Sequence, residues 1–305
     1  MSVLVVGSIG LDTVKTPVAE HADLLGGSAS YAAVSASFFS SVNLVGIVGE
    51  DFPKPHVEFF GSRKIDLCGL QVAPGKTFRW SGEYHADLNT RSTRSIELNV
   101  FEHFTPTLPD GYNHTQYVLL ANIAPSLQSH VLDQMTRPRF VIADTMDLWI
   151  NIAKDDLLAL LKRVDMLILN DSEARQFTGE DSLIKAGKEI RKLGPKYVVI
   201  KKGEHGALLF GENEFFSCGA FPLEVIHDPT GAGDTFAGGL AGYLASLDHP
   251  EVTFAALRKA VVYGTVLASY NVEAFSLERM RTLTFPDIER RYEALKSASH
   301  FEALN

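Results

Sequence analysis

Short apolar runs recur along this chain, and each one stops at a glycine or a polar residue. The runs have strand length and cover residues 3–6, 42–48, 118–121, 140–143, 166–169 and 198–200. Runs that are almost entirely apolar, instead of alternating with polar residues, are typical of strands buried on both faces. Segments of helical character lie between them, near residues 56–63, 127–134, 155–162 and 183–193. This order predicts βαβ units and a mostly parallel sheet with helices on both faces.

The length and composition of the chain suit one globular domain. Hydrophobic residues make up 46% of the 305 residues and no Pro/Ser/Gly-rich linker divides the chain, so we expect a single domain over residues 1–305. The net charge of −9 argues against nucleic acid or an anionic membrane surface as the main partner. No apolar run approaches the ~20 residues of a membrane span, and the start lacks a signal peptide's basic flank, so we expect a cytoplasmic protein.

The hydrophobic period changes to two between residues 77 and 101. Phe78, Trp80 and Tyr84 fall on one face of an extended segment, and polar residues such as Arg79 fall on the other. This alternation predicts a β-hairpin or a small sheet. Its aromatic face either belongs to an ordinary surface flap or covers a ligand or a partner subunit.

Polar residues follow several of the apolar runs. They are Asp12, Asn122, Asp144, Asn170 and Lys201. Each one taken singly also suits a helix cap or a turn. Because ligands gather at the carboxyl ends of parallel strands, their shared position predicts a binding site at that edge of the sheet.

The segment from residue 227 to residue 239 carries the strongest chemical signal. Gly231 and Gly233 free the backbone to turn, and an apolar helix over about residues 240–247 follows. Amide groups converging at a helix start form a site for an anion such as phosphate. Asp234 stands beside that anion, where it could accept a proton from a group attacking phosphorus. The alternative is that Asp234 only caps the helix.

The run Asp-Pro-Thr-Gly-Ala-Gly-Asp-Thr-Phe over residues 228–236 resembles the signature of the ribokinase-like (PfkB) carbohydrate kinase family. Further similar landmarks are residues 26–27, 49–51, 170–173 and 202–206, so the resemblance extends from about residue 3 to about residue 276. It implies a three-layer α/β/α fold with a mostly parallel central sheet and a small β-sheet lid. It also implies transfer of the γ-phosphate of ATP to a hydroxyl group.

The resemblance implies roles for individual residues. Asp234 would be the general base, and the backbone of Gly231, Ala232 and Gly233 would form the anion hole. Asn170 and Glu173 would position Mg²⁺ through water, although the same residues also suit a helix cap. The positions that bind a monovalent cation such as K⁺ in many members are Asp228 and Thr230. On the ATP side, the implied residues are Lys201, Gly203 and Gly206, together with a helix over residues 260–269 beside the adenine.

For the acceptor, the resemblance points to Asp12, Gly26, Gly27, Tyr31 and Asn122. A carboxylate such as Asp12 suits a polyol because each oxygen accepts a hydrogen bond. Three positions depart from the family: Lys201 replaces a common Thr, Tyr31 a common Asn, and Ser28 the Lys of ribokinases proper. The last two argue against a ribokinase. The segment between Asp12 and Gly26 is short, so we expect residues 76–106 to supply most of the lid.

We therefore expect an ATP- and Mg²⁺-dependent kinase of a small sugar or polyol, with a nucleoside kinase as the alternative. The aromatic lid face suits stacking on a base and equally suits a homodimer contact. A non-catalytic binding protein is disfavoured, because a pure binder has no need of Asp234. An NAD-dependent oxidoreductase is disfavoured too, because residues 7–10 do not form a GxGxxG motif.

Overall fold

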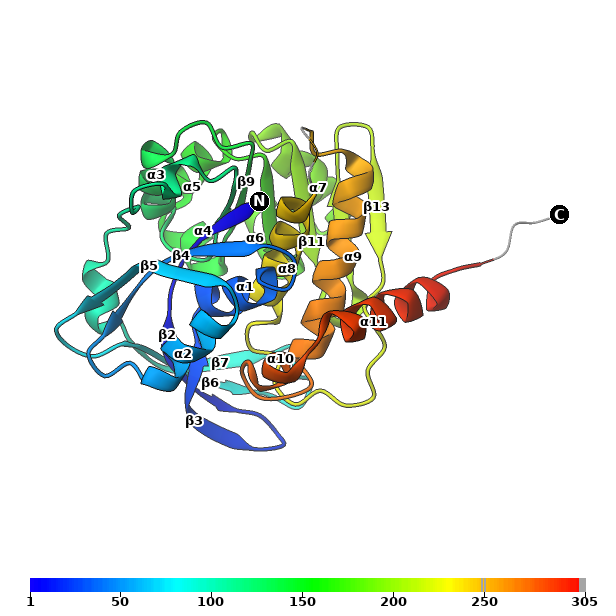
Figure 1. Ribbon diagram of the computed structural model, residues 1–305. Helices are drawn as coiled ribbons and strands as arrows, with labels where there is room; N and C mark the ends of the chain where they lie inside the picture. Colours follow the sequence, from blue (N-terminus) through cyan, green and yellow to red (C-terminus); the bar gives the residue numbers. More distant parts are fainter. Residues whose placement is uncertain (248, 250, 302–305) are drawn as a thin grey trace.

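A nine-stranded sheet forms the centre of the computed structural model, which describes residues 1–247, 249 and 251–301 (Figure 1). Its strands are β1 (Ser2–Val6), β4 (Ser41–Gly49), β5 (Ile65–Ala73), β8 (Tyr117–Leu120), β9 (Phe140–Asp144), β10 (Met166–Asn170), β11 (Tyr197–Lys201), β12 (Ala207–Phe210) and β13 (Phe215–Cys218). The spatial order is β13-β12-β11-β10-β9-β8-β1-β4-β5. All neighbours pair in parallel except at β12 and β13, which pair antiparallel. The predicted, mostly parallel sheet is thus confirmed.

Helices cover both faces of this sheet, because successive strand residues point to opposite sides. In β1, Val3 and Val5 pack with one helical layer, whereas Leu4 and Val6 pack with the other. The first layer holds α1 (Ser28–Ala36), α2 (Lys54–Ser62), α8 (Ala232–Ser246), α9 (Phe254–Asn271), α10 (Glu278–Thr282) and α11 (Phe285–Ala298). The second holds α3 (Pro125–Gln134), α4 (Asp147–Ile152), α5 (Lys154–Leu161), α6 (Asp171–Thr178) and α7 (Leu183–Lys192). In the described part of the chain, no helix combines the length and apolar character needed to cross a bilayer.

Helix α8 begins earlier than its apolar sequence suggests. We expect a helix over about residues 240–247, but the helix starts at Ala232, directly after Gly231. Apart from Phe236, the residues of its first half are small and carry little hydrophobic signal, although most of them are buried. Gly233 and Asp234 consequently lie in the first helical turn and not in the loop before it.

A second sheet of four strands forms the lid, in the order β3-β2-β6-β7. Its strands are β2 (Gly10–Lys15), β3 (Glu20–Gly26), β6 (Phe78–Tyr84) and β7 (Arg91–Glu97). The antiparallel pairing of β6 with β7 confirms the hairpin predicted from alternation. Residues 76–106, which we expect to supply most of the lid, supply two of its four strands, β6 and β7. The short segment 10–26 still makes two strands, because a four-residue turn over residues 16–19 is enough to close a hairpin.

The two faces of the lid differ in character. The outward face carries ion pairs, among them Lys15 with Glu83 and Arg94 with Glu20 and Glu83. The inward face carries Asp12 and the aromatic side chains. Tyr84 is only 7% exposed, and its hydroxyl accepts a hydrogen bond from Thr230 Oγ1 at 3.3 Å. The aromatic face therefore turns toward the sheet and the 228–234 loop. A homodimer contact through the lid remains a prediction.

Candidate active site

The loop before α8 takes a shape that only glycine allows at its centre. Gly231 has a φ of 72°, in the left-handed region, and forms the N-cap of α8. A Cβ atom there would lie 2.4 Å from the ring of Tyr31, which packs directly beneath it. Any larger residue would displace that ring as well as strain the backbone. The start of α8 is thus held at one position above α1.

The first turn of α8 presents amide groups to the site. Ala232, Gly233 and Asp234 occupy this turn, where amide groups lack partners within the helix. The Ala232 amide donates to the carbonyl of Pro229 at 3.2 Å. The Gly233 and Asp234 amides are therefore the better placed of the three for an anion.

A buried ion pair lies against this turn. Lys201, the last residue of β11, and Asp144, the last residue of β9, are joined by a Nζ–Oδ2 distance of 3.3 Å. The Lys201 ammonium is also 2.9 Å from the point where a Cβ of Gly233 would stand. Burial alone would lower the pKa of Lys201, but Asp144, Glu173 and Asp234 raise it above its ordinary value. Lys201 is therefore charged in this site.

The carboxyl group of Asp234 has a raised pKa. Burial and the nearby charge of Asp144 raise its pKa to about 7, against the opposing effect of Lys201 and Arg91. A general base works best when its pKa lies near the working pH, so this value suits the base role predicted for Asp234. A carboxyl group that served only as a helix cap would gain nothing from partial burial beside a second acid.

Asn170 and Glu173 form a reciprocal cap at the start of α6. The Asn170 side-chain oxygen accepts from the Glu173 amide at 2.8 Å, and Glu173 Oε2 accepts from the Asn170 amide at 2.7 Å. The capping alternative is therefore present in the structure. It leaves Glu173 Oε1 without a hydrogen bond among the described residues, and that oxygen remains available to a hydrated cation. Burial raises the pKa of Glu173 to about 7.

The Asp228 carboxylate and the Thr230 backbone form hydrogen bonds with other residues of the chain. The fully buried Asp228 carboxylate accepts from the Thr230 amide at 2.8 Å and from the Ser276 amide at 3.0 Å. The Thr230 carbonyl accepts from the Asn271 side chain at 2.9 Å. These bonds tie the 228–234 loop to the end of α9. A monovalent cation beside this loop stays a prediction.

Asp12 lies on the inward face of the lid strand β2. It is 4% exposed, and its Oδ1 has no hydrogen-bond partner among the described residues. Burial and the charges of Asp228 and Asp234 raise its pKa to about 8. A Cβ on Gly26 would stand 2.0 Å from Asp12 Oδ2, so glycine is required for the strands to close around this carboxyl group. An unpartnered buried carboxyl group is suited to receive hydroxyl donors from a substrate.

Two predicted acceptor residues lie differently from what the sequence suggests. Tyr31 is 1% exposed, and its hydroxyl has no hydrogen-bond partner among the described residues. Its ring packs against Gly231 and is not exposed for binding an acceptor. The Asn122 side chain accepts from Trp149 Nε1 at 2.8 Å and donates to the sulfur of Met146 at 3.0 Å. Asn122 therefore fixes α4, and Trp149 is a neighbour that sequence patterns alone do not indicate.

A large cavity of about 690 Å³ lies beside the start of α8. Lys201, Gly203 and Gly206 line one part of it, as expected, and Thr265 and Ala268 of α9 line another. The turn between β6 and β7 closes over it through three lid residues that the sequence does not single out: Asp87, Leu88 and Asn89. The predicted nucleotide side and the lid thus meet at one cavity.

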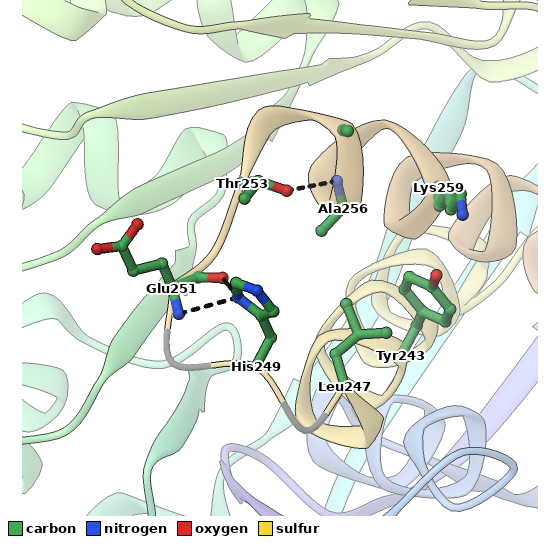
Figure 2. Close-up of a pocket in the computed structure, with 8 residues that line it drawn as sticks. Tyr243, Leu247, His249, Glu251, Thr253, Ala256 and Lys259 are labelled. Atoms are coloured by element: carbon green, nitrogen blue, oxygen red, sulfur yellow. Dashed lines mark hydrogen bonds between the residues drawn. The ribbon is translucent and has the colours of Figure 1, made fainter.

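A smaller cavity of about 290 Å³ lies between the end of α8 and the start of α9 (Figure 2). It is lined by Tyr243, His249 and Lys259 among others, and Thr253 caps α9 there. It contains none of the predicted site residues. It sits at the opposite end of α8 from Asp234, about 15–20 Å away at 1.5 Å per residue. We place the functional site at the larger cavity.

Comparison with known proteins agrees with this geometry. A family model described as "pfkB family carbohydrate kinase" matches residues 12–281. The cytidine kinase of Thermococcus kodakarensis is 32% identical over 251 residues, or 80% of this chain and 88% of that protein.

Solved structures extend the comparison to the fold. A nucleoside kinase of Methanocaldococcus jannaschii has a TM-score of 0.77 at 18% identity, with 96% of this chain and 98% of that chain covered. A ribokinase of Arabidopsis thaliana, complexed with ribose and ATP, has a TM-score of 0.76 at 21% identity, with 95% and 98% covered. At these identities the two structures establish a common fold, the ribokinase fold.

Proposed function

We propose that this chain, which belongs to the pfkB family of carbohydrate kinases, transfers the γ-phosphate of ATP to a hydroxyl group of a nucleoside. The sequence favours a sugar or polyol as acceptor and keeps the nucleoside as an alternative. The similarity to a cytidine kinase supports the alternative better. A contact within the lid supports it too.

That contact is the pairing of Asp12 in β2 with Trp80 in β6. Paired residues of parallel neighbours project from the same face of a sheet, and their strands lie about 4.8 Å apart. Asp12 can accept two hydroxyl groups of a ribose, while the indole beside it can stack on an attached base. Such stacking is worth ~1–3 kcal/mol per base. A free sugar lacks the planar base that gives this stacking its full worth, so this pairing is the observation that carries the nucleoside proposal.

Asp234 accepts the acceptor's hydroxyl proton in the proposed reaction. The hydroxyl oxygen forms a bond to the γ-phosphorus, and the bond from that phosphorus to the bridging oxygen of ADP breaks. The amides at the start of α8 and the ammonium of Lys201 stabilise the negative charge on the transferred group. Closure of the lid over the cavity excludes water, which would otherwise compete with the acceptor.

The residues present fit the Mg²⁺ that accompanies ATP. Among the described residues, no group of three or more His, Cys, Asp or Glu side chains could hold a metal ion directly. Glu173 Oε1 and the Asn170 side chain would instead hold the ion's water shell, as Mg²⁺ prefers. When bound to the nucleotide, the ion neutralises charge on the phosphates.

A screen of ADP release from Mg-ATP tests the acceptor class. We expect at least one pyrimidine or purine nucleoside to give a kcat/KM ~10-fold or more above that of any free pentose, hexose or polyol, the worth of one stacked base. Trp80→Ala should raise the KM for the nucleoside by a similar factor. Phe215→Ala removes an exposed aromatic residue on the distant edge strand β13 and serves as the control.

A free sugar turning over faster than every nucleoside would refute the nucleoside assignment and leave the kinase assignment intact. An unchanged KM in Trp80→Ala would remove the stacking argument.

A further inference from the structure

We propose that Arg91 of the lid is a catalytic residue, whose guanidinium group binds the phosphoryl group during transfer from ATP. The proposal rests on the kinase activity proposed above and adds a residue that neither the sequence motifs nor the comparisons indicate. Three observations carry it: the position of Arg91 in the lid, its lack of an ion-pair partner among the described residues, and the charges already present in the site.

Arg91 begins β7 and pairs directly with Tyr84, the last residue of β6. Directly paired residues of antiparallel strands project from the same face. Tyr84 faces inward, and its hydroxyl contacts Thr230, the residue before Gly231. Arg91 therefore stands on the inward face, one strand away from a residue that touches the loop predicted to hold the phosphoryl group. Its guanidinium lies 5.8 Å from the centre of the Trp80 ring, on the acceptor side of the lid.

The neighbouring lid arginines are neutralised, but Arg91 is not. Arg79 pairs with Asp23 and Asp51, and Arg94 pairs with Glu20 and Glu83. Within residues 1–247, 249 and 251–301, no carboxylate forms an ion pair with Arg91, and the residue is exposed. Arg94, three residues along the alternating strand, lies on the outward face with its partners Glu20 and Glu83. The described part of the lid thus carries an inward guanidinium without a counter-ion.

A further cation would add to the stabilisation that the α8 amides, Lys201 and the nucleotide's Mg²⁺ give the transferred group. Asp144 offsets part of the charge of Lys201, while Asp234 and the γ-phosphate are both anionic. The positive charge of Arg91 also acts on Asp234. Burial and Asp144 raise the pKa of Asp234, and Lys201 and Arg91 oppose that increase. A guanidinium at this position can donate two hydrogen bonds to the oxygens of the transferred group. It gives up no proton, because the only proton that moves goes from the acceptor hydroxyl to Asp234.

The test compares Arg91→Gln with Arg94→Gln. Both variants remove one arginine from the same strand, but only Arg91 faces inward. We expect kcat of Arg91→Gln to fall ~10²- to 10³-fold, as when one preorganised donor to a transition state is lost, with little change in the KM of the acceptor. Arg94→Gln should stay within about twofold of wild type, since an exposed ion pair contributes little. Added guanidinium ion should restore part of the activity of Arg91→Ala but not that of Asp234→Asn.

A binding measurement separates catalysis from folding. Mg-ADP with aluminium fluoride mimics the phosphoryl group in transfer, and Arg91→Gln should lose at least about tenfold affinity for it relative to Mg-ADP alone. Unchanged kcat, or a defect confined to the KM of the acceptor, would overturn the proposal; the latter would make Arg91 an acceptor-binding residue. The comparison uses the best acceptor of the screen, or slow ATP hydrolysis by water, so it stands even when no nucleoside is a substrate.

Discussion

The ammonium group of Lys201 lies 3.3 Å from Asp144 Oδ2, with side chains that are only 18% and 4% exposed. The pair joins the ends of β9 and β11, two strands separated by β10. The Lys201 ammonium lies against Gly233 in the first turn of α8. A buried charge of this kind must keep its partner.

Removing Asp144 alone should therefore destabilise the fold. We expect Asp144→Asn to lower the free energy of unfolding by ~3 kcal/mol, because it leaves the Lys201 ammonium buried without a counter-charge. The double variant Asp144→Asn/Lys201→Met should recover much of that loss, although its activity should stay low. Urea unfolding of the three proteins measures both effects. Equal stability of the single variant and wild type would show that Lys201 can reach solvent.

The acid limb of the pH profile should report on Asp234. With a pKa of about 7 in the empty site, the base is protonated and inactive below that pH and ionised above it. We expect kcat at saturating acceptor, when Asp12 is already ionised, to rise with pH below about 7 and to level off above it, whereas kcat/KM should rise further, to about pH 8, because Asp12 must also lose its proton. Asp234→Asn should fold normally, bind ATP, and lose ~10²- to 10⁴-fold in kcat. A variant that keeps a third of the wild-type rate would contradict the assignment.

Acceptor binding should release a proton from Asp12. The pKa of this carboxyl group is raised to about 8 by burial and by Asp228 and Asp234, so it is mostly protonated at pH 7 in the empty site. Two hydroxyl donors favour the ionised form and lower that pKa on binding. Calorimetry in buffers of different ionisation enthalpy should show the release, which Asp12→Asn should abolish and Asp234→Asn should retain. Binding that is independent of the buffer would place the acceptor elsewhere.

The response to Mg²⁺ should separate the two roles of Glu173. Glu173→Gln keeps an oxygen for the α6 cap but loses the charge that would hold the ion's water shell. We expect EDTA to abolish activity, and Glu173→Gln to raise the Mg²⁺ concentration for half-maximal rate while leaving the KM of the acceptor unchanged. Glu180→Gln, a change beyond the end of α6, is the control. If Glu173→Gln lowers only the melting temperature, the residue is a cap and nothing more.

Potassium should activate the enzyme if a monovalent cation lies beside the 228–234 loop. Asp228 already accepts two backbone amides, so the ion would meet carbonyl oxygens of the loops that this carboxylate holds together. We expect a higher rate in K⁺ than in tetramethylammonium at equal ionic strength. Identical rates would leave Asp228 with its structural role alone.

Much of this molecule follows from local sequence. The apolar runs predict the strands, the period of two predicts the β6–β7 hairpin, and the glycines before Asp234 predict a tight turn at a helix start. These features depend on the side-chain period and on backbone freedom, which neighbouring residues set. The start of α8 and the strands β2 and β3 are not evident from such local patterns, because small residues and short polar strands carry little periodic signal.

Other features depend on contacts between residues far apart in the chain. Lys201 meets Asp144, 57 residues away, because their strands end at the same edge of the sheet. Tyr84 meets Thr230, 146 residues away, because the lid folds back over α8. The Asn122 side chain forms hydrogen bonds with Trp149 and Met146, which the start of α4 brings beside it. The sequence alone predicts which residues of the 228–234 loop would carry its chemistry. Only the tertiary structure decided which charges surround that loop, because strand order, lid register and burial arise from the packing of the whole chain.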